Sequence, residues 1–229
     1  MKKKLDAYRS RLTPGQIADG MNAAARNARR LSEDAESLVS IGRFPTAASV
    51  AALSIEEAGK VSILRELALA RTDADALEVW KRYRSHTSKN IAWLLPQLAA
   101  AGARRLDDLR PLFDETSDHP FVLDNLKQLG FYTDCLGNAH WALPWEVIDE
   151  GLARMLVQIA KALAGKDQHT AREIALWMEH IGPVWKKDPA WMKQALVNWY
   201  GAMQAEGLAT DGPNAMEQFI RYGVQEKGV

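Results

Sequence analysis

Two acidic residues and a lysine stand close together in the segment from Phe44 to Arg71. At about 100° per residue, one stripe of a helix over this segment carries Val50, Leu53, Ser54, Glu57, Val61, Leu64 and Ala68. We therefore expect Glu57 within an apolar face, where a carboxylate must be paired or hydrogen-bonded, and Glu56 nearer to solvent. Lys60 follows Glu57 at i+3, within reach of an ion pair. Glu57 could belong to a functional site or to a structural ion pair, and the pattern leaves both interpretations open.

A histidine with two cations follows in the next segment. In a helix, Arg82 lies at i−4 from His86 and Lys89 at i+3, so the three side chains share one flank. Two cations and an imidazole suit a phosphate group, and a histidine can take or give a proton near neutral pH. The alternative interpretation is a surface edge, where a half-buried histidine bridges core and solvent.

A third polar group lies on the segment 169–181, where His169, Glu173 and His180 share a helix face. A histidine and a glutamate at i, i+4 can ligate a metal. However, the chain has no HExxH motif and no obvious third ligand, and it also lacks GxxxxGK[ST], GxGxxG and GxSxG. We therefore expect neither a metal nor a cofactor.

Long apolar-periodic segments separated by Gly and Pro predict the elements that position these residues. The first helix is expected over 15–41, with Thr13 as N-cap and Pro14 at the first position, and the second over 44–71. The third is expected over 72–101, capped at Thr72, with a kink or an end at Pro96. Further helices are expected over 144–165, over 171–181 with Thr170 as cap, over 189–207 and over 213–222. Residues 102–121 read as a loop or short helix, residues 122–129 as possible helix, and residues 130–138 as an extended stretch with a turn. Long helices with short connections predict an all-α, antiparallel helical bundle.

The composition is that of an ordinary globular chain of 229 residues, with 47% apolar and 25% charged residues. Lys plus Arg balance Asp plus Glu at 29 each, so no overall field favours nucleic acid or an anionic membrane, although residues 1–30 are rich in basic residues. A single cysteine, Cys135, fits a reducing compartment. We expect a cytoplasmic protein without a signal peptide, because no apolar run approaches the roughly 18 residues of a membrane span.

Several short motifs occur in an order that resembles the AbiV family of abortive-infection proteins. The resemblance covers about residues 16–180, and the family's EE-x-GK, SH-x-x-K and Tyr-x-Asp segments correspond to Glu56-Glu57-Ala58-Gly59-Lys60, Ser85-His86-x2-Lys89 and Tyr132-Thr133-Asp134. Further matching positions are Asn22, Ala28, Leu31, Ala35, Leu38, Phe44, Ala47, Trp141, Pro144, Glu173 and Trp177.

This resemblance implies a HEPN-like bundle with additional C-terminal helices and a role in stopping phage multiplication, with shut-off of translation. It suggests a division into a basic tail (1–15), a HEPN/AbiV-like domain (16–182) and a C-terminal helical extension packed on it (183–229). Many HEPN proteins are homodimeric, metal-independent ribonucleases that pair an arginine and a histidine with four to six residues between them. Here only three residues separate Arg82 from His86, so whether the chain is an enzyme stays open.

The matching polar residues define a candidate site and two candidate functions. Glu57, His86 and Asp134 are the candidate catalytic residues, and Lys60, Arg82 and Lys89 are the candidate RNA- or phosphate-binding residues. The first function is interference with translation or RNA. The second is a non-catalytic helical module that sequesters a phage or host protein through an exposed apolar patch. Trp185, Trp191 and Trp199 are candidates for such a patch or for a dimer face. The expected partners are thus a phage or host protein, or RNA, and a second copy of the chain, but not a membrane.

Overall fold

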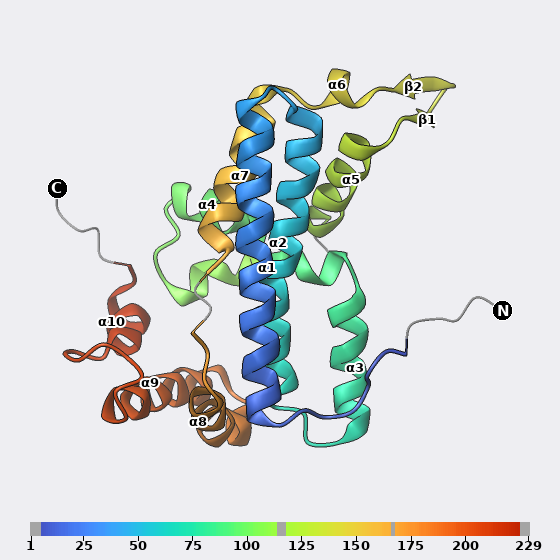
Figure 1. Cartoon of the computed structure of the whole chain (residues 1–229). Helices are drawn as coiled ribbons and strands as arrows, with labels where there is room; N and C mark the ends of the chain where they lie inside the picture. Colours follow the sequence, from blue (N-terminus) through green and yellow to red (C-terminus); the bar gives the residue numbers. More distant parts are fainter. Residues whose placement is uncertain (1–5, 114–117, 166–167, 225–229) are drawn as a thin grey trace.

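The computed structural model is built around two long helices that run antiparallel through the molecule (Figure 1). It describes residues 6–113, 118–165 and 168–224. α1 (Pro14–Ser40) and α2 (Phe44–Leu67) form the central pair. α5 (His119–Phe131) and α7 (Glu150–Leu163) pack on one half of α2, and α3 (Asp73–Arg84) packs on the other half. This arrangement confirms the predicted all-α class.

The remaining elements are short or lie toward the C-terminus. They are η1 (Thr87–Lys89), η2 (Ile91–Leu94), α4 (Leu95–Ala100), η3 (Leu106–Phe113), β1 (Asp134–Leu136), β2 (His140–Ala142), α6 (Pro144–Val147), α8 (Ala171–Ile181), η4 (Gly182–Val184), α9 (Pro189–Ala205) and α10 (Ala215–Tyr222). β1 and β2 pair antiparallel, with Cys135 opposite Trp141.

Helix starts follow local capping chemistry. Thr13 caps α1 in a reciprocal capping box with Gln16, and Pro14 occupies the first position, as predicted. Thr72 and Asp75 form the same box on α3. Thr170 caps α8 through the backbone N–H of Glu173, again as predicted. These starts are set by residues within one turn, which explains why the sequence located them.

Small residues let the central helices approach closely. The core between α1, α2 and α7 is rich in alanine, including Ala35, Ala48, Ala52 and Ala160. The larger side chain of Leu156 is buried in the same cluster. At the other end of the bundle, a second core cluster joins the start of α1 and the end of α2 to α3 and α8. A third core cluster joins α8 to α9. Alanine-rich contacts bring backbones together, so polar groups on α2 can meet side chains from its neighbours.

The segment 72–101 is not one helix, and that prediction is wrong. α3 ends at Arg84, because Ser85 adopts an extended conformation (ψ 132°). Ser85 then accepts a hydrogen bond from the backbone N–H of Ser88 (3.3 Å), which starts the tight turn η1. Pro96 lies at the start of α4 instead of kinking a longer helix. His86 therefore lies on a turn and not on a helix flank.

The predicted helix over 144–165 is also divided in two. Ile148 is extended, and Asp149 caps a new helix, α7, by accepting a hydrogen bond from the backbone N–H of Leu152 (2.8 Å). The extended stretch predicted near residues 130–138 is present as the hairpin β1–β2, which projects from one end of the bundle (Figure 1).

The C-terminal helices lie beside the opposite end of the bundle (Figure 1). α9 packs on α8 through Trp199, which is buried, together with Ala195 and Met203. Trp185 is partly buried, and Trp191 is exposed. The division at residue 183 into separate units stays a prediction. Among the described residues, no helix combines the length and apolar character needed to cross a membrane.

Candidate functional site

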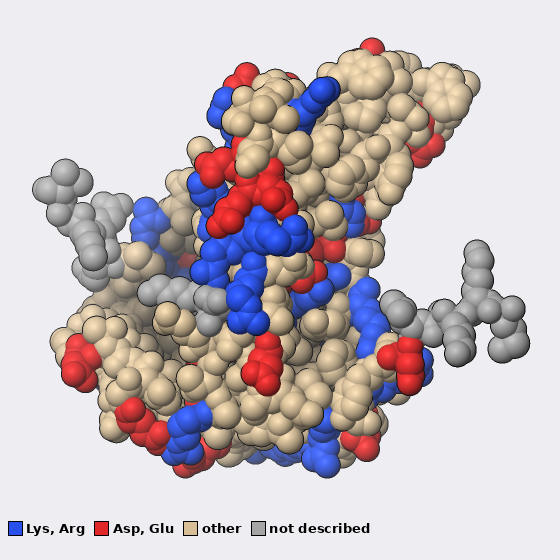
Figure 2. All heavy atoms as spheres, in the orientation of Figure 1, with Lys and Arg blue, Asp and Glu red and all other residues tan. Residues whose placement is uncertain are grey.

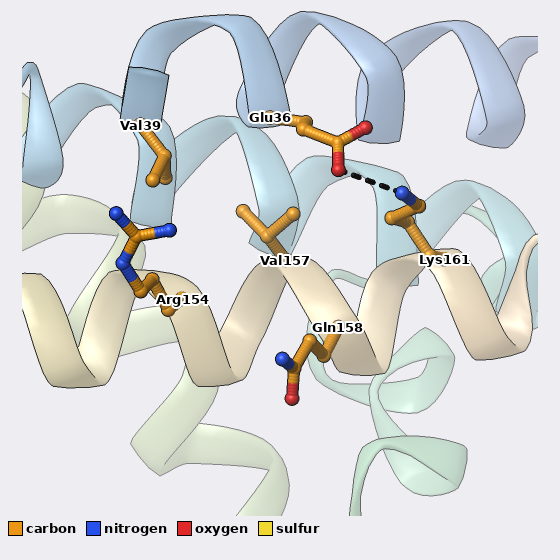
Figure 3. A pocket seen from close by; sticks show the side chains of 6 residues that line it. All are labelled: Glu36, Val39, Arg154, Val157, Gln158 and Lys161. Atoms are coloured by element: carbon orange, nitrogen blue, oxygen red, sulfur yellow. Dashed lines mark hydrogen bonds and ion pairs between the residues drawn. The ribbon is translucent and has the colours of Figure 1, made fainter. Parts of the chain in front are cut away.

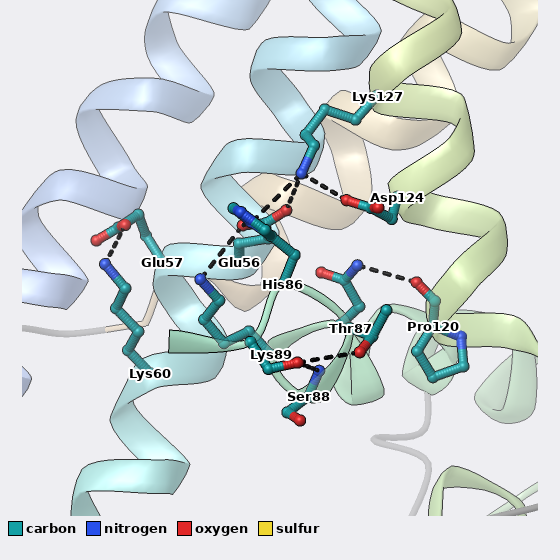
Figure 4. A network of polar contacts seen from close by, with 12 residues as sticks. Glu56, Glu57, Lys60, His86, Thr87, Ser88, Lys89, Pro120, Asp124 and Lys127 are labelled. Atoms are coloured by element: carbon teal, nitrogen blue, oxygen red, sulfur yellow. Dashed lines mark hydrogen bonds and ion pairs between the residues drawn. The ribbon is translucent and has the colours of Figure 1, made fainter. Parts of the chain in front are cut away.

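A buried carboxylate, that of Glu56, is the centre of the strongest polar cluster in the described structure (Figure 4). Its Oε2 lies 2.7 Å from Nδ1 of His86, and its Oε1 accepts a hydrogen bond from Nζ of Lys127 at 2.6 Å. Nζ of Lys89 lies 3.4 Å from Oε2. Lys127 also donates to Asp124 at 2.6 Å. The site thus joins α2, the turn η1 and α5.

A glycine in α2 allows η1 to reach Glu56. A Cβ added at Gly59 would overlap the backbone carbonyl of Lys89, so only glycine permits this approach. Asn90, fully buried after η1, donates from Nδ2 to the carbonyl of Pro120 (3.0 Å) and so ties the turn to α5. The Gly59 approach brings the 86–89 segment onto the face of α2 that carries Glu56.

A second glycine fixes α5 against α2. A Cβ at Gly130 would overlap Oγ of Ser49 and the carbonyl of Pro45. The Ser49 hydroxyl in turn donates to the carbonyl of Lys127, 3.0 Å away. This contact holds the Lys127 backbone against α2, two turns before Glu56, so that the lysine side chain reaches the carboxylate.

The two lysines of the cluster respond differently to burial. Burial lowers the pKa of Lys89, and the attraction of Glu56 offsets only part of that effect. Burial also acts to lower the pKa of Lys127, but hydrogen bonds to Asp124 and Glu56 outweigh it, so that pKa is raised. Lys127 therefore stays protonated, and its positive charge offsets the negative charge of the buried Glu56 carboxylate.

His86 is the accessible member of the cluster. Its side chain is 60% exposed, whereas that of Glu56 is 4% exposed. Nδ1 is the ring nitrogen that faces the carboxylate, and most of the side chain is open to solvent. A buried carboxylate that orients a histidine by one ring nitrogen leaves the other free to accept or donate a proton. The arrangement is suited to acid–base chemistry at the surface.

The same group resembles a metal site in its spacing. Ligand atoms of Glu56, His86 and Asp124 all lie within 4.8 Å of one another. However, the Lys127 ammonium already bonds both carboxylates and lies 3.5 Å from Nδ1 of His86. A metal would have to displace a buried ammonium whose pKa is raised, so the residues do not suit a metal ion.

The structure reverses the predicted roles of the two glutamates. Glu57 is partly exposed and pairs with Lys60, the structural pair that the sequence left open, whereas Glu56 is buried. The prediction that Glu56 is the wetter of the two is wrong. α2 is buried on nearly every side, so its apolar stripe does not identify one inward face. Lys60 and Glu57 remain within electrostatic reach of Lys89.

Two predicted residues lie away from this cluster. Arg82 bonds Glu66, which is ten residues beyond Glu56 and thus about 15 Å further along α2. It borders a cavity of about 350 Å³ with Arg71 and Trp185. Asp134 is exposed on β1, where its carboxylate accepts a hydrogen bond from the backbone N–H of Cys135 (2.8 Å). Of the predicted set, the structure brings His86 and Lys89 together on Glu56.

Sequence reasoning missed Lys127 and Asp124 entirely. Their i, i+3 spacing on α5 is a signal for an ion pair. Nothing local indicates that the pair meets Glu56, because the contact joins positions 71 residues apart.

A second buried carboxylate, that of Glu173 on α8, forms a cluster that we interpret as structural. The Glu173 carboxylate lies 3.0 Å from Nδ1 of His169 and accepts a hydrogen bond from Arg65 at 2.9 Å. Burial acts to raise the pKa of Glu173, but His169, Arg65 and the backbone of Thr170 outweigh it and lower that pKa. Asn22 exchanges two hydrogen bonds with the backbone of His169. The group ties α8 to α1 and α2.

A shallow hollow of about 300 Å³ lies between α1 and α7 (Figure 3). Val39 and Val157 are buried beneath it, and Lys161 pairs with Glu36 across it at 2.7 Å. Its acid and base satisfy one another, so the hollow offers less for chemistry than the Glu56 cluster does.

The bundle that positions this polar cluster defines an all-α protein, a fold consistent with the HEPN-like class of the family that matches it. The family model HEPN_AbiV, described as AbiV, matches residues 16–165. The chain therefore belongs to the AbiV family, and the family assigns it to phage defence by abortive infection. The match ends just before α8. No curated protein and no solved structure gives a match to the chain.

Proposed function

We propose that this AbiV-family protein stops phage multiplication by acting on RNA and so interfering with translation, with His86 as its acid–base group. The observation that carries the proposal is the exposed imidazole of His86, held through Nδ1 by the buried carboxylate of Glu56. An exposed histidine without such a partner would rotate freely and would not favour one tautomer.

The proposed reaction is transesterification at an RNA phosphate. Nε2 of neutral His86 takes the proton of a ribose 2′-hydroxyl, and that oxygen attacks the adjacent phosphorus. The bond from phosphorus to the 5′-oxygen of the next nucleotide breaks. The leaving oxygen takes up a proton from water, and His86 returns the proton it accepted to the solvent. The products are a 2′,3′-cyclic phosphate and a 5′-hydroxyl. Glu56 stabilises the imidazolium that forms, as in other carboxylate–histidine pairs.

The experiment that tests the proposal is incubation of the purified protein with transfer and ribosomal RNA. We expect fragments ending in a cyclic phosphate, and we expect them to disappear in His86→Ala. His180→Ala is the matched control, since His180 lies on α8, outside the cluster. Intact RNA with the wild-type protein under conditions in which it protects cells would contradict the proposal.

Sequestration of a phage or host protein is the second candidate function. It is favoured by a separate observation, a set of exposed aromatic side chains around the hairpin. This function needs no acid–base group, so it predicts that His86→Ala protects cells against phage as well as the wild type does. Plaquing efficiency at matched protein levels therefore separates the two functions.

A further inference from the structure

The hairpin β1–β2 and its neighbours carry the three most exposed Trp, Tyr and Phe side chains among the described residues. Trp145 is 68% exposed, and Trp141 and Tyr132 are each 62% exposed. Phe131, Leu136 and Val147 are also exposed, and α6 contacts α5 beside them. We call these six residues, from positions 131–147, the aromatic projection. Figure 2 shows this part of the molecule at upper right as a surface with few charged side chains that stands out from the bundle.

The hairpin lacks the cover that small sheets normally have. Opposite residues of an antiparallel pair share a face, so Cys135 and Trp141 lie on one face and Leu136 and His140 on the other. All four residues are exposed. A two-stranded hairpin is marginally stable by itself and normally packs one face on a core. Exposed apolar surface of this kind marks an interaction site.

The charge on the aromatic projection indicates the partner. Over positions 131–147 the chain has two acids, Asp134 and Glu146, and no Lys or Arg. Nucleic acids and anionic membranes are bound through cations, so this charge opposes both. Two copies meeting through the same surface would place their acids together. We propose that the aromatic projection docks a different protein, one with an apolar groove rimmed by Lys or Arg.

This inference is independent of the RNA activity, because the aromatic projection and His86 lie on different elements. If docking delivers the protein to its target, loss of docking abolishes protection in cells while leaving cleavage of purified RNA unchanged. Loss of His86 instead abolishes cleavage of purified RNA and leaves docking intact.

The test uses two labelled amphipathic peptides with the same apolar face, one with a Lys rim and one with a Glu rim. Fluorescence anisotropy with the full chain should show the Lys-rimmed peptide binding at least about 10-fold more tightly. That preference should shrink as salt rises from about 0.1 M to about 1 M. Trp141→Ser/Trp145→Ser should weaken binding by at least about 10-fold, whereas Trp191→Ser, an exposed tryptophan on α9, should not.

A second variant, with two charges reversed, keeps the proposal testable if the double tryptophan variant loses the structure of the hairpin. Asp134→Lys/Glu146→Lys keeps the aromatic side chains and should remove the preference for the Lys-rimmed peptide. Equal binding of both peptides by the wild type, or binding that survives loss of Trp141 and Trp145, would overturn the proposal. So would tighter binding of a single-stranded oligonucleotide, of anionic vesicles or of a second copy of the chain to the same residues.

Discussion

Glu56 and Glu173 are both buried carboxylates that face a histidine and a basic side chain, but they differ in what surrounds the histidine. His86 is 60% exposed beside Glu56, whereas His169 is 18% exposed beside Glu173. Asn22 also fixes the backbone of His169, and Arg65 stacks over Trp177 at 5.3 Å. The same three kinds of residue thus form a solvent-accessible site in one place and an enclosed structural contact between helices in the other.

Under the proposed function, solvent access, and not residue type, separates the reactive cluster from the structural one. An exposed imidazole can exchange a proton with a bound molecule, whereas an enclosed one cannot. At Glu173 the same pair holds α8 against the bundle, and its partners are already satisfied. The following predictions test that contrast.

The largest expected effect is on activity in His86→Ala. If His86 is the acid–base group, its loss lowers RNA cleavage by about 10²- to 10⁴-fold, the usual contribution of such a group. The melting temperature should change little, because the side chain is mostly exposed. His169→Ala should do the opposite, lowering the melting temperature while the folded protein stays active. Equal loss of activity in both variants would show that the contrast between the two clusters is wrong.

Glu56→Ala should give the largest loss of stability. It leaves Lys89 and Lys127 buried without their shared carboxylate, which costs about 3–5 kcal/mol in the free energy of unfolding. Glu57→Ala is the matched control on the adjacent position. It removes only a partly exposed pair with Lys60 and should cost about 1 kcal/mol or less. Urea unfolding of the two variants measures the difference, and similar losses would contradict the reversed burial of the two glutamates.

Gly59→Ala should have a smaller effect on stability, and it should act on the site. The added methyl group overlaps the Lys89 carbonyl and must push η1 away from α2, at a cost of about 1–3 kcal/mol for overpacking. Because η1 follows His86, RNA cleavage should fall as well. Gly15→Ala is the control, since its Cβ would meet nothing within 4 Å. Unchanged stability and cleavage in Gly59→Ala would show that η1 tolerates displacement.

The smallest expected effect is a pH dependence at Glu173. Its pKa is held below the ordinary 4.5 in the folded chain, so the ionised form contributes stability above that value. That contribution disappears as the pH falls through the lowered pKa. Thermal melting of wild type and Glu173→Gln should therefore differ at about pH 7 and converge toward about pH 3. If the difference in melting temperature between the two proteins stays constant over this range, the charge of Glu173 does not stabilise the contact of α8 with α1 and α2.

Local chemistry in the sequence determined where most helices begin and what class of fold they form. Thr13, Thr72 and Thr170 cap their helices as the pattern predicts, because an N-cap is satisfied within one turn. The motifs that contain Gly59, His86 and Lys89 also mark stretches of chain that the structure brings together at Glu56. Periodicity failed in α2, because a helix buried on nearly every side has no single apolar face.

Only the tertiary structure decided which polar residues meet. Glu56 takes the buried position because Gly59 admits η1 and Gly130 admits α5, and both approaches join residues far apart in the chain. Lys127 belongs to the site for the same reason. The sequence determined the helices and the candidate segments, since these depend on neighbours within a turn. The choice of Glu56 over Glu57, and of an open His86 over a closed His169, depended on long-range packing that no local pattern encodes.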